Sequence, residues 1–108
     1  MYNLIKISEN EYEFSNEKNL VVGKGFLNNN VPVNKITIEI NENHRGKGYG
    51  KELLKEMIKE YKKNSNESQL RFEVYEKNTI TNIIEDFGGL NKSNQDGIST
   101  YILPIQNI

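Results

Sequence analysis

The stretch from residue 36 to residue 61 constrains the fold most, because three patterns follow one another in it without a break. In residues 36–41, isoleucines alternate with polar side chains, which is typical of a half-buried β-strand. A loop with the sequence Arg-Gly-Lys-Gly-Tyr-Gly follows at residues 45–50. Apolar side chains then recur at helical spacing, which predicts an amphipathic helix over residues 48–63.

A glycine-rich loop between a strand and a helix favours an anionic ligand. The N–H groups of the first helical turn have no intrahelical acceptor, and the helix dipole adds partial positive charge there. Glycines let an anion approach the backbone, and Arg45, Lys47 and Lys51 add full charges. The spacing fits neither the G-x-x-x-x-G-K-[ST] loop nor the G-x-G-x-x-G dinucleotide fingerprint. We therefore expect a phosphate or pyrophosphate guest in a loop of another kind.

The spacing Arg45-x-x-Gly48-x-Gly50 resembles the acyl-CoA-binding motif of the GNAT superfamily of N-acetyltransferases. This resemblance implies that backbone amides of residues 38–40 contact the pantetheine and thioester, and that amides of residues 45–50 hold the pyrophosphate. The residues expected to bind acetyl-CoA (coenzyme A) are therefore Ile38, Glu39, Ile40, Arg45, Gly46, Lys47, Gly48, Tyr49, Gly50, Lys51 and Asn78. The alternatives are a glycine-rich turn without a ligand and, for Asn78, a plain helix N-cap.

The other patterns predict a single α+β domain over residues 1–108. A second helix is expected from an N-cap at Asn78 to Gly88, and polar turn material at residues 91–97. Because a long helix joins strands 36–41 and 69–75, these two strands are expected to be parallel in a mixed sheet. The predicted strands are residues 2–7, 10–14, 20–27, 31–41, 69–75 and 98–105. The resemblance makes this a GNAT-like acyl-CoA N-acyltransferase fold with a mixed central sheet and two main helices.

Two departures from the family pattern bear on activity. The family normally has two helices after its first strand, but here only about a dozen residues separate that strand from Leu20. Many members also carry a tyrosine in the second helix that protonates the leaving thiolate. The equivalent position is Ile84, so the proton donor of those members is missing here.

Acyl transfer to an amine requires a base for the ammonium and an acid for the thiolate. Glu39 is the candidate base because it lies beside the expected thioester; a solvated strand residue is the alternative. His44 has a suitable intrinsic pKa but sits at the phosphate end of the site. Tyr101, and after it Tyr75, are the candidate acids, although tyrosines on strands are more often packing residues.

Composition excludes several classes of site and partner. The net charge of −1 argues against a nucleic-acid-binding protein. With no cysteine and one histidine, we expect no metal site. No apolar run is long enough to span a membrane, and residues 1–9 do not resemble a signal peptide, so we expect a cytoplasmic protein without membrane partners.

These observations leave three hypotheses. The first is an acetyl-CoA-dependent N-acetyltransferase that acts on an amine of a small molecule or a peptide. The second is a non-catalytic module with a GNAT fold that binds coenzyme A or a protein partner. The third is an interaction domain that uses residues 45–51 for nucleic acid or protein. A thin acceptor side also predicts that a homodimer can cover the exposed sheet face.

Overall fold

The computed structural model describes residues 2–75 and 80–108 as two antiparallel sheets around one long helix. The elements in chain order are β1 (Asn3–Lys6), β2 (Glu11–Ser15), β3 (Val21–Leu27), β4 (Ile36–Ile40), η1 (Glu42–His44), α1 (Tyr49–Lys63), β5 (Gln69–Tyr75), α2 (Ile80–Asp86), β6 (Leu90–Gln95) and β7 (Ile98–Pro104). The α+β class is therefore confirmed. The short 3-10 turn η1 was not predicted.

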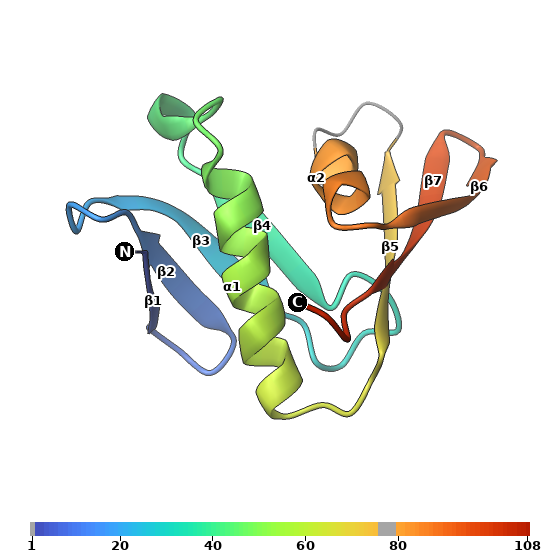
Figure 1. Ribbon diagram of the computed structural model, residues 1–108, viewed down its shortest axis with the longest axis horizontal. Helices are drawn as coiled ribbons and strands as arrows, with labels where there is room; N and C mark the ends of the chain where they lie inside the picture. The colour runs from blue at the N-terminus through green and yellow to red at the C-terminus, as the bar shows by residue number, and fades with distance from the viewer. Residues whose placement is uncertain (1, 76–79) are drawn as a thin grey trace.

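The expected mixed sheet needs a correction. The strands form a sheet of order β1-β2-β3-β4 and a second sheet of order β5-β7-β6, and every pairing within them is antiparallel. In Figure 1, β4 and β5 both run upward but diverge like the arms of a V, and no strand ladder joins them. The parallel orientation was predicted correctly, whereas the hydrogen-bonded pairing was not.

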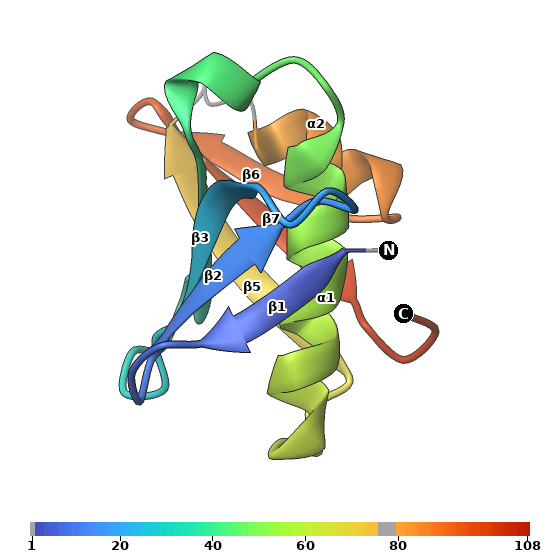
Figure 2. The same cartoon turned by 90° about the vertical axis from the view of Figure 1, so that its left-hand side faces the viewer.

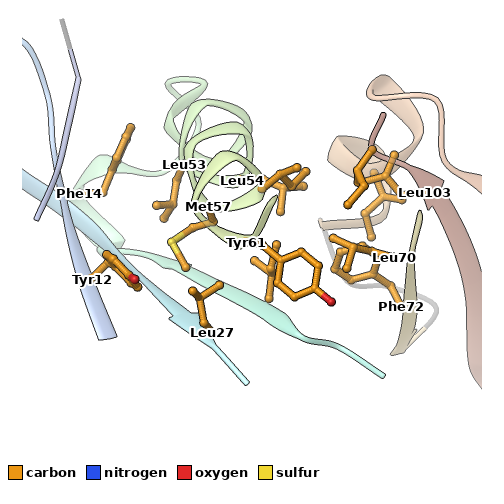
Figure 3. Packing of buried hydrophobic residues seen from close by; sticks show 14 of the residues in the cluster. Tyr12, Phe14, Leu27, Leu53, Leu54, Met57, Tyr61, Leu70, Phe72 and Leu103 are labelled. Atoms are coloured by element: carbon orange, nitrogen blue, oxygen red, sulfur yellow. The ribbon is translucent and has the colours of Figure 1, made fainter. Parts of the chain in front are cut away.

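Helix α1 supports both sheets. Its buried residues are Leu53, Leu54, Met57, Ile58 and Tyr61, which follow the helical period seen in the sequence. Figure 3 shows α1 with Tyr12 and Phe14 on one side and Phe72 and Leu103 on the other. Gly25 on β3 lets α1 approach closely, because a Cβ there would clash with Met57. One continuous core therefore holds the two arms of the V together.

Strands β1 and β2 are joined directly by residues 7–10, with no helix between them. The sequence had indicated that two helices would not fit there, and the structure agrees. Figure 2 shows α1 and α2 on the same side of the sheets. On the opposite face, Ile5, Thr37 and Glu39 are exposed. We call this the outer face.

Two segments differ from the sequence predictions. Strand β4 begins at Ile36 and not at Val31; residues 31–35 form a bend in which Asn34 has a φ of 56°. Residues 90–95 form strand β6 and not a turn, and only Asp96 and Gly97, both with positive φ, make the connection to β7. Every residue of β6 is exposed, so the strand has no apolar alternation by which to recognise it.

The remaining predictions are close. Strand β5 has the predicted limits, and α1 begins one residue after the expected start, with Gly48 as its N-cap at a φ of 84°. Helix α2 is followed by Gly88 at a φ of 93°, the left-handed residue that commonly ends a helix. In the described part of the chain, none of the helices is both long enough and apolar enough to cross a membrane.

Candidate functional site

A cleft of about 910 Å³ opens where β4 and β5 diverge. The strands form its two walls, while the loop before α1 and one side of α2 close its upper end. It is lined by Asn34, Ile36, Thr37, Ile38, Glu39, Ile40, His44, Arg45, Gly46, Gly48, Tyr49, Gly50, Lys51, Phe72, Glu73, Val74, Tyr75, Ile80, Ile83 and Asp86. Nine of the predicted cofactor-binding residues are in this set.

The edge of β4 offers backbone groups to the cleft. The Lys35 carbonyl accepts from the Asn28 N–H, and the Asn41 N–H donates to the Val22 carbonyl. The backbone groups of the odd-numbered residues in and beside β4 therefore face β3. Because backbone groups alternate between the two edges of a strand, those of Ile38 and Ile40 face the cleft. A chain-like ligand placed there can pair with β4 as a missing strand would.

The upper end of the cleft has the properties of an anion site. Gly46 and Gly48 have φ values of 78° and 84°, and a Cβ on either would meet nothing within 4 Å. The N-cap residue Gly48 has no side chain to accept from the first N–H groups of α1, so these groups stay available to a ligand. Arg45 donates from Nε to the Ile40 carbonyl at 3.0 Å, which ties the loop to the end of β4. These features fit a phosphate or pyrophosphate group.

Tyr49 connects this loop to the N-terminal sheet. Its ring makes edge contacts with those of His44 and Tyr2, with centroids 6.3 and 6.2 Å apart, and its hydroxyl accepts from Asn16 Nδ2 at 3.4 Å. Partial burial, with the nearby carboxylates of Glu17 and Glu52, raises the pKa of the Tyr2 phenol. Tyr49 therefore fixes the loop by its side chain.

The other predicted loop residues divide by role. Gly50 permits contact between α1 and α2, because a Cβ there would lie 2.9 Å from Ile83 Cδ1. Lys51 lines the cleft with its ammonium 5.7 Å from the centre of the Phe87 ring. Lys47 is exposed and does not line the cleft. Asn78 lies outside the described residues.

The catalytic candidates are placed differently from one another. Glu39 lines the cleft from the outer face of β4, opposite Lys24 of β3. Tyr75 is 75% exposed at the end of β5 and also lines the cleft. Tyr101 is only 6% exposed, between β5 and β6 on the central strand β7, and does not line the cleft. The structure thus brings Glu39 and Tyr75 together around one space and leaves Tyr101 in the core.

Sequence reasoning missed four polar residues of the cleft, which are Asn34, Thr37, Glu73 and Asp86. Asn34 lies where the two strands begin to diverge, Glu73 lines the β5 wall, and Asp86 contributes from α2. Glu73 is on the polar face of an alternating strand, and this alternation was a usable indication that its side chain was not in the core. Asn34 had no such indication, because its partners are 37 and 39 residues away along the chain.

Solved structures similar to this chain are acetyltransferases. An acetyltransferase (GNAT family) from Bacillus anthracis matches with a TM-score of 0.70 at 14% identity, covering 91% of this chain and 68% of its own. A putative phosphinothricin N-acetyltransferase matches at 0.66 and 20% identity, covering 95% and 72%. An acetyltransferase from Agrobacterium tumefaciens matches at 0.66 and 17%, covering 85% and 58%. At these identities the likeness shows the fold.

This chain is shorter than several of the structures it matches. It spans 58% of the Agrobacterium protein and 64% of the dodecameric spermidine N-acetyltransferase from Vibrio cholerae. No curated protein matched the sequence. The model of the acetyltransferase (GNAT) family matches residues 11–82, well over half of the 108 residues. The chain therefore belongs to the acetyltransferase (GNAT) family.

Proposed function

We propose that this protein is an acetyl-CoA-dependent N-acetyltransferase. The observation that carries the proposal is the cleft between β4 and β5, which has an anion site at one end and the Glu39 carboxylate on its wall. A long acyl carrier with a pyrophosphate matches this layout, because its phosphates and its thioester must be held at separate places. Family membership agrees with this assignment.

The residues of the chain divide the binding work between them. In this scheme the first-turn N–H groups of α1 and the Arg45 guanidinium bind the pyrophosphate, which is supported by their position at the cleft. The cleft-facing backbone groups of Ile38 and Ile40 bind the pantetheine amides and the thioester carbonyl. An N–H group aimed at that carbonyl stabilises the oxyanion that develops as the amine attacks.

Glu39 is the base in this scheme. It removes a proton from the acceptor ammonium, directly or through one water, so that the neutral amine attacks the thioester carbonyl. The carbon–sulfur bond then breaks and the sulfur takes the electron pair and a proton. The nitrogen, now bonded to the acetyl carbon, gives up its second proton, which restores the group that protonated the sulfur. Tyr75, whose position lines the cleft, replaces the originally favoured Tyr101 as donor of the proton to sulfur. Tyr101 is buried in the core.

The acceptor is proposed to be a cationic amine on a small molecule or a peptide. Glu39 and Glu73 line the cleft and favour an ammonium group there. Arg71 holds Glu73 in a 3.1 Å ion pair, so Glu39 carries most of that attraction. The similar structures include proteins named spermidine/spermine N-acetyltransferase and phosphinothricin N-acetyltransferase, which act on different acceptors by their names.

A non-catalytic coenzyme A-binding module is the second candidate. Ile84 is fully buried in α2 and offers no hydroxyl. The chain also has no helix between β1 and β2 that could cover the outer face beside Glu39. Both observations weaken catalysis but leave the anion site untouched. The two candidates therefore share cofactor binding and differ in turnover.

Calorimetric titration with acetyl-CoA, followed by assay of free thiol release with a panel of amines, tests both candidates. Binding in the micromolar range with thiol release supports the enzyme. Binding without release from any amine supports the module. No binding at millimolar acetyl-CoA contradicts both and shifts attention to a partner of residues 45–51. Light scattering on the same sample tests the predicted homodimer.

A further inference from the structure

One residue, Asn34, makes the hydrogen bonds between the bend before β4 and β5. Among the residues that the structure describes, the hydrogen bonds that join residues 28–41 to β5 all involve Asn34. Its N–H donates to the Arg71 carbonyl at 3.1 Å, its Nδ2 donates to the Glu73 carbonyl at 2.9 Å, and its Oδ1 accepts from the Glu73 N–H at 2.9 Å. The side-chain amide thus pairs with β5 as a peptide unit would.

This pairing separates the strands as well as joining them. In a ladder, two backbones lie about 4.8 Å apart along their whole length. Here the Asn34 backbone bonds directly to Arg71, but two residues further along β5 the Asn34 side chain, and not a backbone group, pairs with Glu73. Residues 36–40 then diverge from β5 (Figure 1), and Asn34 itself lines the cleft. The amide is suited to this place because it donates and accepts in one plane. Asparagine also tolerates the φ of 56° better than most side chains.

Neighbouring contacts hold Asn34 in position. Asn28 Nδ2 donates to the Asn34 carbonyl at 2.9 Å and to Thr37 Oγ1 at 2.8 Å, which braces the bend against β4. The next residue, Lys35, donates to Glu67 Oε1 at 2.9 Å, and Glu67 in turn accepts from the Tyr61 hydroxyl at 2.8 Å. The bend is thereby attached to α1 and to the loop before β5.

We propose that Asn34 is a positioning residue that sets the opening of the cleft between β4 and β5. It fixes Glu73 in space, two residues before Tyr75, and it fixes the start of β4, four residues before Ile38. The Asn34 amide therefore fixes the distance between β5 and the part of β4 that carries Glu39 and the cleft-facing backbone groups. The geometric part stands on the structure alone, while its effect on coenzyme A affinity rests on the proposed function.

Distances between spin labels test the geometry. The chain has no cysteine, so cysteines introduced at Lys24 on β3 and Ile98 on β7 are labelled uniquely, and neither position lines the cleft. Electron–electron double resonance then reports the separation of the two sheets. Asn34→Gly keeps the positive φ and the backbone bond but removes both side-chain bonds, so we expect a broadened and shifted distribution. Asn34→Asp keeps the acceptor but turns a carboxylate oxygen toward the Glu73 carbonyl, so we expect a longer mean distance.

Asn19→Gly is the matched control. Asn19 also has a positive φ, 62°, and sits in an exposed turn away from the cleft. We expect its distance distribution to coincide with that of the unsubstituted chain. If Asn34→Gly and Asn34→Asp also coincide with it, the proposal is wrong. If Asn34→Gly does not fold, the Asn34→Asp distribution decides alone.

Coenzyme A titration of the unlabelled variants supplies the functional readout. We expect Asn34→Gly to weaken binding about tenfold, as the loss of two positioning hydrogen bonds allows, and Asn19→Gly to leave it unchanged. Equal affinities for these two variants would overturn the positioning role. If the unsubstituted chain itself does not bind coenzyme A, the proposed function fails, and the label distances still decide the geometric role of Asn34.

Discussion

Gly48 matters through its backbone conformation and through the space in front of it. Its φ of 84° is unfavourable for most residues with a Cβ, and that Cβ would enter open space at the proposed anion site. Gly97, in the β6–β7 turn, has a φ of 78° and equally open surroundings, but it lies away from the cleft. Substitution of either glycine causes similar backbone strain, but only substitution of Gly48 would also obstruct a ligand in the cleft.

We expect Gly48→Ala and Gly97→Ala to lower the free energy of unfolding by a similar amount, about 1 kcal/mol each. Only Gly48→Ala is expected to weaken acetyl-CoA binding, by at least about tenfold, because its methyl group occupies the ligand's approach. Denaturant melts and calorimetry on the two variants check this. Equal loss of affinity in both would show that the effect is only one of strain.

Glu39 has a close structural match in Glu13. Both carboxylates lie directly across from Lys24 on β3, on the outer face of the same sheet, but only Glu39 lines the cleft. We expect Glu39→Gln to lower kcat about 100-fold or more and to leave acetyl-CoA affinity unchanged, as for the loss of a general base. Glu13→Gln should retain full turnover. A Glu39→Gln protein with normal kcat would remove Glu39 from the mechanism.

Single residues were the least predictable part of the site. The glycines and Arg45 were found because they are adjacent in sequence and have a recognisable spacing. Asn34 was missed because its role depends on Glu73, a partner 39 residues away. Tyr101 was favoured as an acid, but its burial is decided by β7 being the central strand of a separate sheet, which alternation in one strand cannot reveal.

At the scale of elements, Glu67 joins the bend before β4 to α1 and to the loop before β5. Hydrogen bonds from Lys35 and then Tyr61 lower the pKa of the Glu67 carboxyl below its ordinary value of 4.5. Its stabilising contribution is therefore complete above the unfolded-state pKa and is lost as the pH falls through the lower folded-state value.

We therefore expect Glu67→Gln to lower the Tm near neutral pH, and the difference from the unsubstituted protein to shrink below about pH 4. Thermal melts from pH 7 to pH 3 measure this. The control is Glu56→Gln, which removes a partly exposed 3.8 Å ion pair on α1 and should change the Tm little at any pH. A Glu67→Gln difference that stays constant down to pH 3 would contradict the assigned contact.

Elements with strong periodicity were predicted well. Strand β5 and helix α1 follow the apolar periods of two and 3.6 residues, because each buries one side. Strand β6 was missed because its side chains are all exposed and only backbone pairing with β7 makes it a strand. The Asp-Gly pair at residues 96–97 was the available indication, since this dipeptide favours a tight hairpin turn. The start of β4 was placed too early because Val31 and Val33 resemble strand residues, although Pro32 between them has no N–H to donate.

For the whole molecule, the proposed ligand contacts both sheets at once. A ligand that binds only the folded state raises its stability by about 2.7 kcal/mol at a concentration 100 times its Kd. For a domain of this size, we expect saturating coenzyme A to raise the Tm by about 10 °C or more. Differential scanning fluorimetry measures the shift, with Gly48→Ala as the variant that should lose it. A saturable binding isotherm without any rise in Tm would contradict binding to the folded cleft.

The fold class was predictable as a whole, but the division of the strands into two sheets was not. The order of strands and helices and the long crossover helix indicate strands β4 and β5 side by side in the same direction. Whether these two strands form a ladder depends on Asn34 and on the side chains that line the cleft between them. Neither Asn34 nor these side chains form a periodic pattern in the sequence.

The separation of the sheets also determines where the candidate site lies. Each sheet is made from one uninterrupted length of chain, residues 3–40 for the first and 69–104 for the second, and no strand crosses from one to the other. Every strand pairing therefore lies within one of the two units, and the units are joined through α1 and the bend before β4. The cleft belongs to neither unit alone, because β4 supplies one wall and β5 the other. The candidate site is therefore a property of the assembled molecule and not of either unit.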